Sequence, residues 1–444
     1  MGDNWKKNVA MASIDYTSIL FNDDFDQKIE PNSLPQNLTR IIFGNKFNQK
    51  IDADSLPENL TTLTFGFYFN QKIEPHTLPE SLTHVIFGFC FNQKLLSNTL
   101  PESLIHVTFG HEFNHKIEPS ILPENLTSVT FDCFFIQKID PDTFPKKLTS
   151  ATIDGEFVQK IELGNLSKNL TSVTFGANFD QKIEKDTLPE NLASVTFGNN
   201  FNQEIEPDTL PENLTSVTFG VFFNQKIKHR VLPKNLLNLV FHGLFNQKIK
   251  HGILPKNLLT LKLGRNFNQK IEPFTLPESL TSIALGYSFN QKIEPLTLPE
   301  NLSFIDFGRS FDQKIEPLTL PESLISITFG YCFDQKIDLD ILPSNLTKIS
   351  FNWAHQGEIN KNKIEMINNI PGYYDVKIFF KYHDIINIEG SKWPMHISNY
   401  MENKWSLDTY EIIDTYNHPV YDSITVLVDK SSYEPFSYAK SALK

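Results

Sequence analysis

The sequence predicts a β-rich solenoid, a stack of short coils that share one long parallel sheet. A phenylalanine recurs every 22 residues without an insertion, fifteen times from Phe25 to Phe333. The residues between these markers repeat one pattern, as in FNQEIEPDTLPENLTSVTFG over residues 201–220. A fixed period of this length indicates repeats that are too small to bury their own apolar faces and must stack on their neighbours.

Each repeat is numbered here from its marker phenylalanine as position 1. Position 14 is Leu in every repeat, position 17 is aliphatic, with Ala151 the smallest, and position 19 is Phe in all but three. These apolar residues alternate with Thr and Ser, which predicts a short strand that ends at position 20 with Gly or another turn residue, such as Asp132 or Asn352. Pro at position 7 in many repeats and at position 11 in nearly all excludes a long helix from the return path. We expect that path to be extended or a single 3₁₀ turn.

Stacking identical coils places like residues in columns. The columns at positions 1 and 19, with Phe21, contain 28 of the 38 phenylalanines, and we interpret them as core. A rise of ~4.8 Å per coil suits offset stacking of such rings. Counting an N-terminal half-coil at residues 16–21, we expect sixteen parallel strands in a sheet roughly 75 Å long.

The segments outside the repeats are predicted to cover the ends of the solenoid. We divide the chain into an N-terminal leader or cap (residues 1–13), the solenoid (14–359) and a C-terminal α/β cap (360–444). In that cap residues 363–370 are expected to be a helix, and residues 376–380 and 423–428 strands. The alternative for residues 360–444 is a distinct effector domain.

Composition narrows the classes of function. A formal net charge of −12 argues against nucleic-acid binding, and no apolar run is long enough for a membrane span. The N-terminus has no apolar signal stretch. Cys90 and Cys133 lie two coils apart, roughly 10 Å, too far for a disulfide, so a chain with only these two and Cys332 is predicted to be intracellular and cytoplasmic. We also expect a monomer. Six Asn-Leu-Thr triplets match a glycosylation pattern, but we interpret their Asn residues as turn formers.

No catalytic motif is present, so we expect neither an enzyme nor a cofactor. His84 and His106 occupy position 16 of adjacent repeats, with His111 and His115 close in the chain. Four histidines could hold Zn²⁺, but no Cys or carboxylate completes a recognisable spacing, so we expect no metal. Partner contact or ordinary surface is the alternative that we favour.

Two polar columns have a structural explanation and a functional one. Position 2 is Asn or Asp in thirteen repeats, and we interpret its side chain as capping a turn through backbone N–H groups. Positions 16 and 18 are Ser and Thr in five consecutive repeats, from Ser128 and Thr130 to Ser216 and Thr218. This hydroxyl ladder could bind a glycan, but small and β-branched residues also suit a sheet face.

The most variable positions are 21 and 22, in the loop that follows each strand. Variation along one edge of a constant scaffold is typical of a binding surface. Phe67, Tyr68 and Phe89 would lie together there, and aromatic residues are common interface anchors. The alternative is that these rings fold over the core.

The second candidate surface is a basic segment. Residues 223–266 contain nine Lys or Arg residues and no Asp or Glu. Seven of them are candidates for docking an acidic partner: Lys226, Lys228, Arg230, Lys234, Lys248, Lys250 and Lys256. The alternative is that two neighbouring repeats arose by duplication and share an ancestor's lysines.

The combination of Phe-Asn-Gln-Lys-Ile, Leu-Pro and Leu-Thr-Ser-Val-Thr-Phe-Gly resembles the FNIP repeat, a relative of the leucine-rich repeat. The resemblance covers about residues 14 to 359 and implies a leucine-rich-repeat-like, right-handed and gently curved solenoid. That family occurs mainly in social amoebae and in giant viruses of amoebae, which would place a viral member in the host cytoplasm. Some members carry an N-terminal F-box, but about thirteen residues before the first half-coil are too few for one.

Together these observations predict a non-catalytic scaffold for protein–protein interaction with an unidentified partner. Two alternatives remain open. One is a carbohydrate-binding protein that uses the hydroxyl ladder, and the other is a substrate-recruiting module of a ubiquitin ligase that lacks its own F-box.

Overall fold

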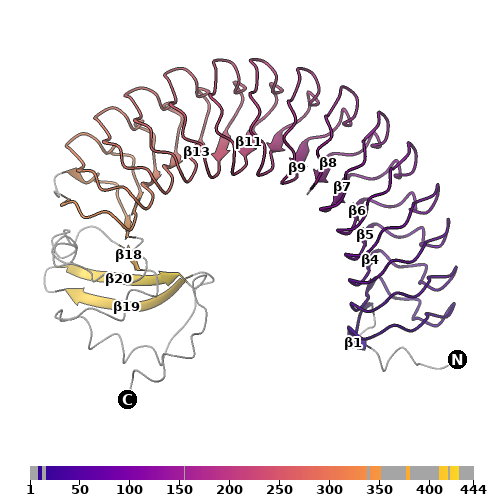
Figure 1. Cartoon of the computed structure of the whole chain (residues 1–444). Coiled ribbons are helices and arrows are strands. Elements are labelled where there is room, and N and C mark those ends of the chain that lie inside the picture. Colours follow the sequence, from indigo (N-terminus) through magenta and orange to yellow (C-terminus); the bar gives the residue numbers. More distant parts are fainter. Residues whose placement is uncertain are drawn as a thin grey trace. The chain divides into compact units, whose positions relative to one another are not determined.

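The computed structural model describes residues 9–12, 17–154, 156–337, 341–351, 377–380, 410–418 and 421–429. It divides into two compact units, residues 1–236 and 237–444, and each unit is described by itself. Both units contain the same coil, a short strand followed by a return path without an α-helix in its described residues (Figure 1).

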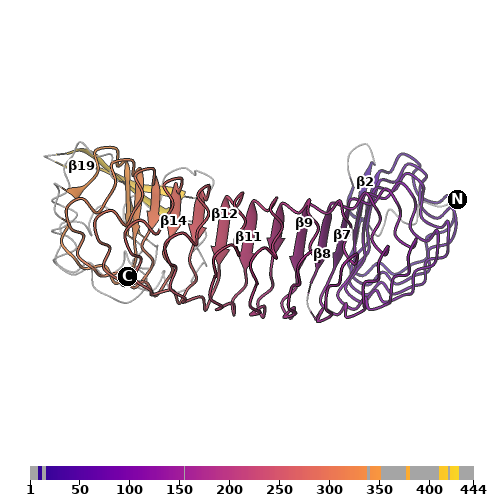
Figure 2. The same cartoon turned by 90° about the horizontal axis from the view of Figure 1, so that it is seen from above.

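The first unit contains ten parallel strands, one in each coil. Neighbouring strands pair in register at a step of 22 residues, so that Val195 lies between Val173 and Val217. Strands β7, β8 and β9 lie side by side in Figure 2, and β11 lies farther along the same row. The ten strands are β2 Ser18–Phe21, β3 Arg40–Ile42, β4 Thr62–Thr64, β5 His84–Ile86, β6 His106–Thr108, β7 Ser128–Phe131, β8 Ser150–Ile153, β9 Ser172–Phe175, β10 Ser194–Thr196 and β11 Ser216–Phe219.

An additional strand precedes this parallel set. Strand β1, Val9–Ala12, pairs antiparallel with β2, and Ala12 lies opposite Ile19. Its backbone therefore occupies the edge of β2 that no preceding coil covers.

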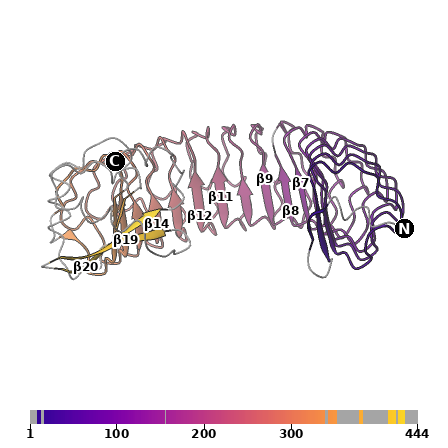
Figure 3. The same cartoon turned by 90° about the horizontal axis from the view of Figure 1, so that it is seen from below.

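The second unit continues the repeat with six parallel strands, of which β12 and β14 are labelled in Figure 3. A separate sheet has β20 in its centre, parallel to β18 and antiparallel to β19. Strands β18 and β20 fall where the sequence predicts strands, whereas the predicted helix at 363–370 lies outside the described residues. The strands are β12 Asn238–Phe241, β13 Thr260–Lys262, β14 Ser282–Ala284, β15 Phe304–Asp306, β16 Ser326–Phe329, β17 Lys348–Phe351, β18 Lys377–Phe380, β19 Tyr410–His418 and β20 Tyr421–Asp429.

Each coil contains three tight turns. The coil that begins at Phe47 shows the hydrogen bond of each turn. Phe47 N–H donates to Gly44 O at 3.1 Å, Leu60 N–H to Pro57 O at 3.1 Å and Ser55 N–H to Asp52 O at 3.2 Å. In the last of these turns position 8 has a positive φ and position 7 is commonly Pro, which is the signature of a type II turn. The return path is therefore extended between turns.

The core consists of columns at positions 1, 5, 10, 14, 17 and 19, whose apolar residues are buried except for the half-buried Ile227. The phenylalanines stack in parallel along the columns, so their prediction as core is confirmed. The ring centroids of Phe47 and Phe69 are 6.0 Å apart, and the angle between the ring planes is 5°. This spacing exceeds the ~4.8 Å between paired strands, because position 1 lies farther from the strands than position 19 does. The strands therefore line the inner side of each curved unit (Figure 1).

The position-2 side chains connect neighbouring coils. Asn48 Oδ1 accepts hydrogen bonds from Asn70 N–H at 2.9 Å and from Gln71 Nε2 at 3.1 Å. Asp26 Oδ1 accepts the equivalent pair from the next coil. The predicted bond to backbone N–H is confirmed, but the donor belongs to the following coil and not to the residue's own turn. Only an acceptor oxygen is required, which explains why Asn and Asp alternate there.

The Asn of position 13 donates to the preceding coil. Asn59 Nδ2, for example, bonds to Gln36 O at 3.0 Å, and Asn213 Nδ2 bonds to Glu190 O at 2.9 Å. These residues belong to the Asn-Leu-Thr triplets, and their amides therefore serve coil stacking in addition to the turn before the strand.

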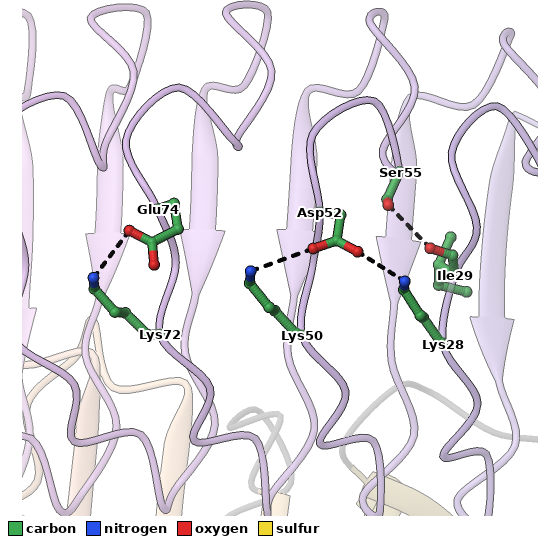
Figure 4. Close-up of polar contacts among 7 residues, drawn as sticks. All are labelled: Lys28, Ile29, Lys50, Asp52, Ser55, Lys72 and Glu74. Atoms are coloured by element: carbon green, nitrogen blue, oxygen red, sulfur yellow. Dashed lines mark hydrogen bonds and ion pairs between the residues drawn. The ribbon is translucent and has the colours of Figure 1, made fainter.

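Charged residues at positions 4 and 6 form ion pairs along the surface of the return path. Figure 4 shows Asp52 between Lys28 at 2.9 Å and Lys50 at 3.5 Å, and Lys72 beside Glu74 at 2.9 Å. The same figure shows a buried contact, Ser55 Oγ donating to Ile29 O at 3.0 Å. Exposed pairs of this kind contribute little to stability.

Candidate functional site

The loop that follows each strand carries the predicted aromatic residues of the first unit. Their side chains are exposed: Phe67 by 41%, Tyr68 by 53% and Phe89 by 37%. The rings of Phe67 and Phe89 stack with centroids 4.5 Å apart, and Tyr68 meets Phe67 edge-on at 4.8 Å. The three residues therefore lie together on the surface, as the sequence predicts, and do not fold over the core.

The structure extends this cluster by two residues that sequence reasoning missed. His111 stacks on Phe89 at 4.2 Å, and Phe134 meets His111 edge-on at 4.5 Å. We call Phe67, Tyr68, Phe89, His111 and Phe134 the aromatic row. His111 occupies the same repeat position as Phe67 and Phe89. Alignment of the repeats could therefore have predicted that His111 belongs to this cluster.

The other predicted histidines lie apart from the aromatic row. His84 and His106 stack on the sheet face, 4.6 Å between centroids. Burial and, to a smaller extent, the neighbouring His106 lower the pKa of His84. His115 lies at position 3 with its Nε2 3.1 Å from Asn92 O. No group of three potential metal ligands occurs among the described residues.

The basic residues of the first unit are largely paired with acidic residues. Lys228 contacts Glu204 at 2.6 Å and Glu206 at 3.1 Å. Arg230 bonds Asp208 through two nitrogens, and Lys234 lies 3.6 Å from Glu212. Because the preceding coil supplies these carboxylates, much of the local positive charge is neutralised. Lys226 has no ion pair within the described part of the chain.

In the second unit the pattern is mixed. Lys248 lies 3.3 Å from Glu272, whereas Lys250 and Lys256 have no ion pair among the residues that the structure describes. The candidates with uncompensated charge are therefore Lys226, Lys250 and Lys256, fewer than the seven that the sequence suggested.

The predicted hydroxyl ladder forms a regular face on β7 to β11. Ser172, Ser194 and Ser216 pair in register, and Thr174, Thr196 and Thr218 do the same two residues later. Their side chains are half-buried on a strand face. This arrangement suits cross-strand packing, and the ladder itself contains no charged group, so glycan binding stays a prediction.

A second row at position 21 was not predicted. In the second unit Arg265, Tyr287, Arg309 and Tyr331 alternate, and each guanidinium lies over a tyrosine ring at 4.8 to 5.0 Å from its centroid. Cation–π contacts of this kind hold both guanidinium groups close to the tyrosine rings. The sequence signal was the alternation of Arg and Tyr at one repeat position.

Within the described ranges the structure contains no helix that is both long and apolar enough to span a bilayer.

The stacked coils, in-register parallel strands and variable strand-end loop define a leucine-rich-repeat-like solenoid. The family model of the FNIP repeat matches residues 16–46, 47–90, 91–134, 113–155, 157–200, 201–243, 245–288 and 289–332. The chain therefore belongs to the FNIP repeat family, and the predicted resemblance is confirmed.

A solved structure supports the same fold. It is that of CroV588 from the giant virus CroV, described as a novel circular LRR protein, with a TM-score of 0.70 and 40% identity. The similarity covers 82% of this chain and 56% of that one, so this chain spans little more than half of that protein's length. A second solved structure is that of the pneumococcal vaccine antigen PcpA, which is 13% identical to this chain. The match covers 84% of this chain and 77% of that one, but its TM-score of 0.13 carries no argument. No curated protein matches the chain.

Proposed function

We propose that the protein is a non-catalytic scaffold that binds a protein partner through the aromatic row of its first unit. The observation that carries this proposal is the contact of five exposed or half-exposed rings across four successive loops. Exposed aromatic clusters of this kind mark interfaces, because rings bury a large area at a small cost in side-chain entropy. A stack of repeats supplies a rigid base for them.

The uncompensated lysines support a second contact with an acidic partner. Lys226, Lys250 and Lys256 are exposed cations, and the rest of the chain is acidic. Such charges mainly increase association rates and respond to salt, whereas buried aromatic residues set the strength of the complex. We expect the aromatic row to dominate affinity and the lysines to add its salt dependence.

We further propose that binding takes place in the cytoplasm, in that of the host if the chain is viral. The three cysteines are free thiols. Burial raises the pKa of both Cys90 and Cys133, which keeps these thiols protonated and poorly reactive. A protein without disulfides suits a reducing compartment.

The test is quantitative capture from amoebal lysate by the full chain and by the double variant Phe67→Asn, Phe89→Asn. Asn45 and Asn199 occupy the same repeat position, so the fold accepts this residue there. We expect the variant to capture at least tenfold less of a specific protein than the wild type does, because two interface anchors have been removed. Phe274→Asn is the matched control, since Phe274 is also exposed, by 61%, but lies in the other unit. Equal capture by wild type and double variant would refute the proposal.

Lys250→Glu tests the basic contact separately. Glu is the common residue at this position in other repeats, and Lys250 has no ion pair in the described residues, so the substitution removes no contact. We expect weaker capture and a smaller loss of capture between low and physiological salt. Lys228→Glu is a less suitable test, because it would place a carboxylate beside Glu204 and Glu206.

A further inference from the structure

The second unit contains a pocket that neither the repeat nor the family explains. Its volume is about 320 Å³, and it lies where β13 to β16 end. Its lining includes Lys262, Ala284, Tyr287, Asp306, Arg309 and Tyr331. Most repeats have Thr at position 18, where this one has Ala284, and the smaller side chain leaves room on the strand surface.

Two charged residues flank Ala284 on the neighbouring strands. Lys262 pairs in register with Ala284 on one side, and Asp306 pairs with it on the other. They are the only charged residues at position 18 of any repeat. A cation and a carboxylate therefore face each other across a gap of two strand spacings, roughly 10 Å between backbones.

The Arg–Tyr row supplies a second cation to the lining. Arg309 lies over the rings of Tyr287 and Tyr331, at 5.0 and 4.8 Å from their centroids. A guanidinium that lies over aromatic rings can still donate its N–H groups to a planar acceptor. Neither Arg309 nor Lys262 has an ion pair among the described residues. In this they differ from most lysines of the return path, such as Lys270, Lys292 and Lys314, which are paired with Glu.

The backbone is also distinctive at this place. Gly286 and Gly308 have φ of 84° and 75°, and no other position-20 glycine in the described coils has a positive φ. Gly308 N–H donates to Asp306 Oδ1 at 2.8 Å, which holds the carboxylate in place. Burial raises the pKa of Asp306, and the Gly308 hydrogen bond and Lys262 oppose that rise.

We propose that this pocket binds a carboxylate group, held by Lys262 Nζ and the Arg309 guanidinium, with the rest of the ligand in the space beside Ala284. Two cations line the pocket against one carboxylate, so an anion is favoured. The planar fork of Arg matches a carboxylate in bidentate geometry. Asp306 would repel a phosphate dianion more than a monoanion, which favours a carboxylate over phosphate.

An acidic peptide side chain and a small free acid share this chemistry, and the probes below separate them. The inference concerns the second unit alone and does not depend on the aromatic row. Its failure would therefore leave the proposed scaffold function standing, and the reverse also holds.

Calorimetric titration of the full chain tests the pocket with four probes at low salt. They are a capped peptide with a single glutamate, its glutamine analogue, butyrate and inorganic phosphate. We expect the glutamate peptide or butyrate to bind at least tenfold more tightly than the glutamine peptide and phosphate. Tighter binding of the glutamate peptide would assign the site to an acidic segment, and tighter binding of butyrate to a small acid. Binding of the glutamine peptide as tight as that of the glutamate peptide, or preference for phosphate, would overturn the proposal.

Substitution then places the binding in this pocket. Lys262→Thr restores the common residue of position 18, so the strand should form as it does elsewhere. We expect roughly tenfold weaker binding of the preferred acid, as for loss of one charge-assisted contact. Lys292→Thr is the matched control, because it removes the same charge from a lysine paired with Glu294 on the return path. Equal losses in both variants would show a non-specific charge effect and refute the assignment.

Discussion

At the scale of single residues, the repeat holds one position in a conformation that most side chains avoid. Position 8 has a positive φ in all fourteen coils where it is described, and Asn, Asp or Gly occupies it in eight of them. Phe274, Leu296 and Leu318 occupy it in three successive coils of the second unit, with exposed side chains. A residue with a Cβ is strained in this region, and Asn tolerates it better.

Leu318→Asn should therefore stabilise the protein. Leu318 is 86% exposed at φ 67°, so the substitution relieves backbone strain and removes no buried contact. We expect a gain of about 0.5–1 kcal/mol, measured as a higher urea midpoint at unchanged m-value. Leu163→Asn is the control, since Leu163 is 74% exposed but is not among the residues with positive φ. Equal effects at both positions would show that lost surface hydrophobicity, and not φ, is responsible.

The position-2 acceptor gives a second prediction at this scale. Asn268 Oδ1 accepts from Asn290 N–H at 2.9 Å and from Gln291 Nε2 at 3.0 Å. Asn268→Asp keeps the acceptor and should change stability by less than about 0.5 kcal/mol, whereas Asn268→Ala should cost about 1–2 kcal/mol. Faster hydrogen exchange of the Asn290 amide in the Ala variant alone would confirm the acceptor role. A large loss in the Asp variant would contradict it.

At the scale of elements, the glycine that follows most strands limits how closely those coils stack, although Asp132, Asp154 and His242 occupy the same position elsewhere. A Cβ added at Gly198 would lie 1.7 Å from Gly176 O of the preceding coil. Glycine is therefore required by the neighbour's carbonyl and not by its own φ, which is not positive at this residue.

Gly198→Ala should force the two coils apart and destabilise the first unit. Overpacking of this kind costs about 1–3 kcal/mol, and backbone on both sides cannot yield easily. The urea midpoint should fall, and exchange should increase in β9 to β11. Gly252→Asn is the control, because nothing lies within 4 Å of its Cβ position and Asn accepts its φ of 77°. An unchanged midpoint for Gly198→Ala would mean that coil spacing adapts without cost.

The sequence predicted the parts of the coil that repeat. The 22-residue period, Leu at position 14 and Phe at positions 1 and 19 suffice for the strands and the core, because identical coils can stack in only one register. It did not reveal the pocket beside Ala284, which arises from differences among three repeats at position 18. The inter-coil donor at position 2 was missed for a related reason, since hydrogen bonds between coils have no signature within one repeat.

At the scale of the whole molecule, a solenoid coil contacts only its neighbours, so its stability depends on how the ends are covered. In the first unit β1 supplies antiparallel hydrogen bonds to the edge of β2. Residues 9–12 therefore cover this edge, and they lie within the segment 1–13 for which the sequence suggested a capping role. An uncovered strand edge frays and can pair with another molecule.

Deletion of residues 1–12 should therefore expose the edge of β2. We expect faster hydrogen exchange in β2 and β3 and none of this increase in β7, because the effect must pass through each intervening coil. Sedimentation should show concentration-dependent association, since the free edge offers unpaired backbone groups. Deletion of residues 1–8 retains β1 and serves as the control. If both deletions leave exchange in β2 unchanged, the buried side chains of the first coil, such as Ile19 and Phe21, hold the end of the stack without the strand.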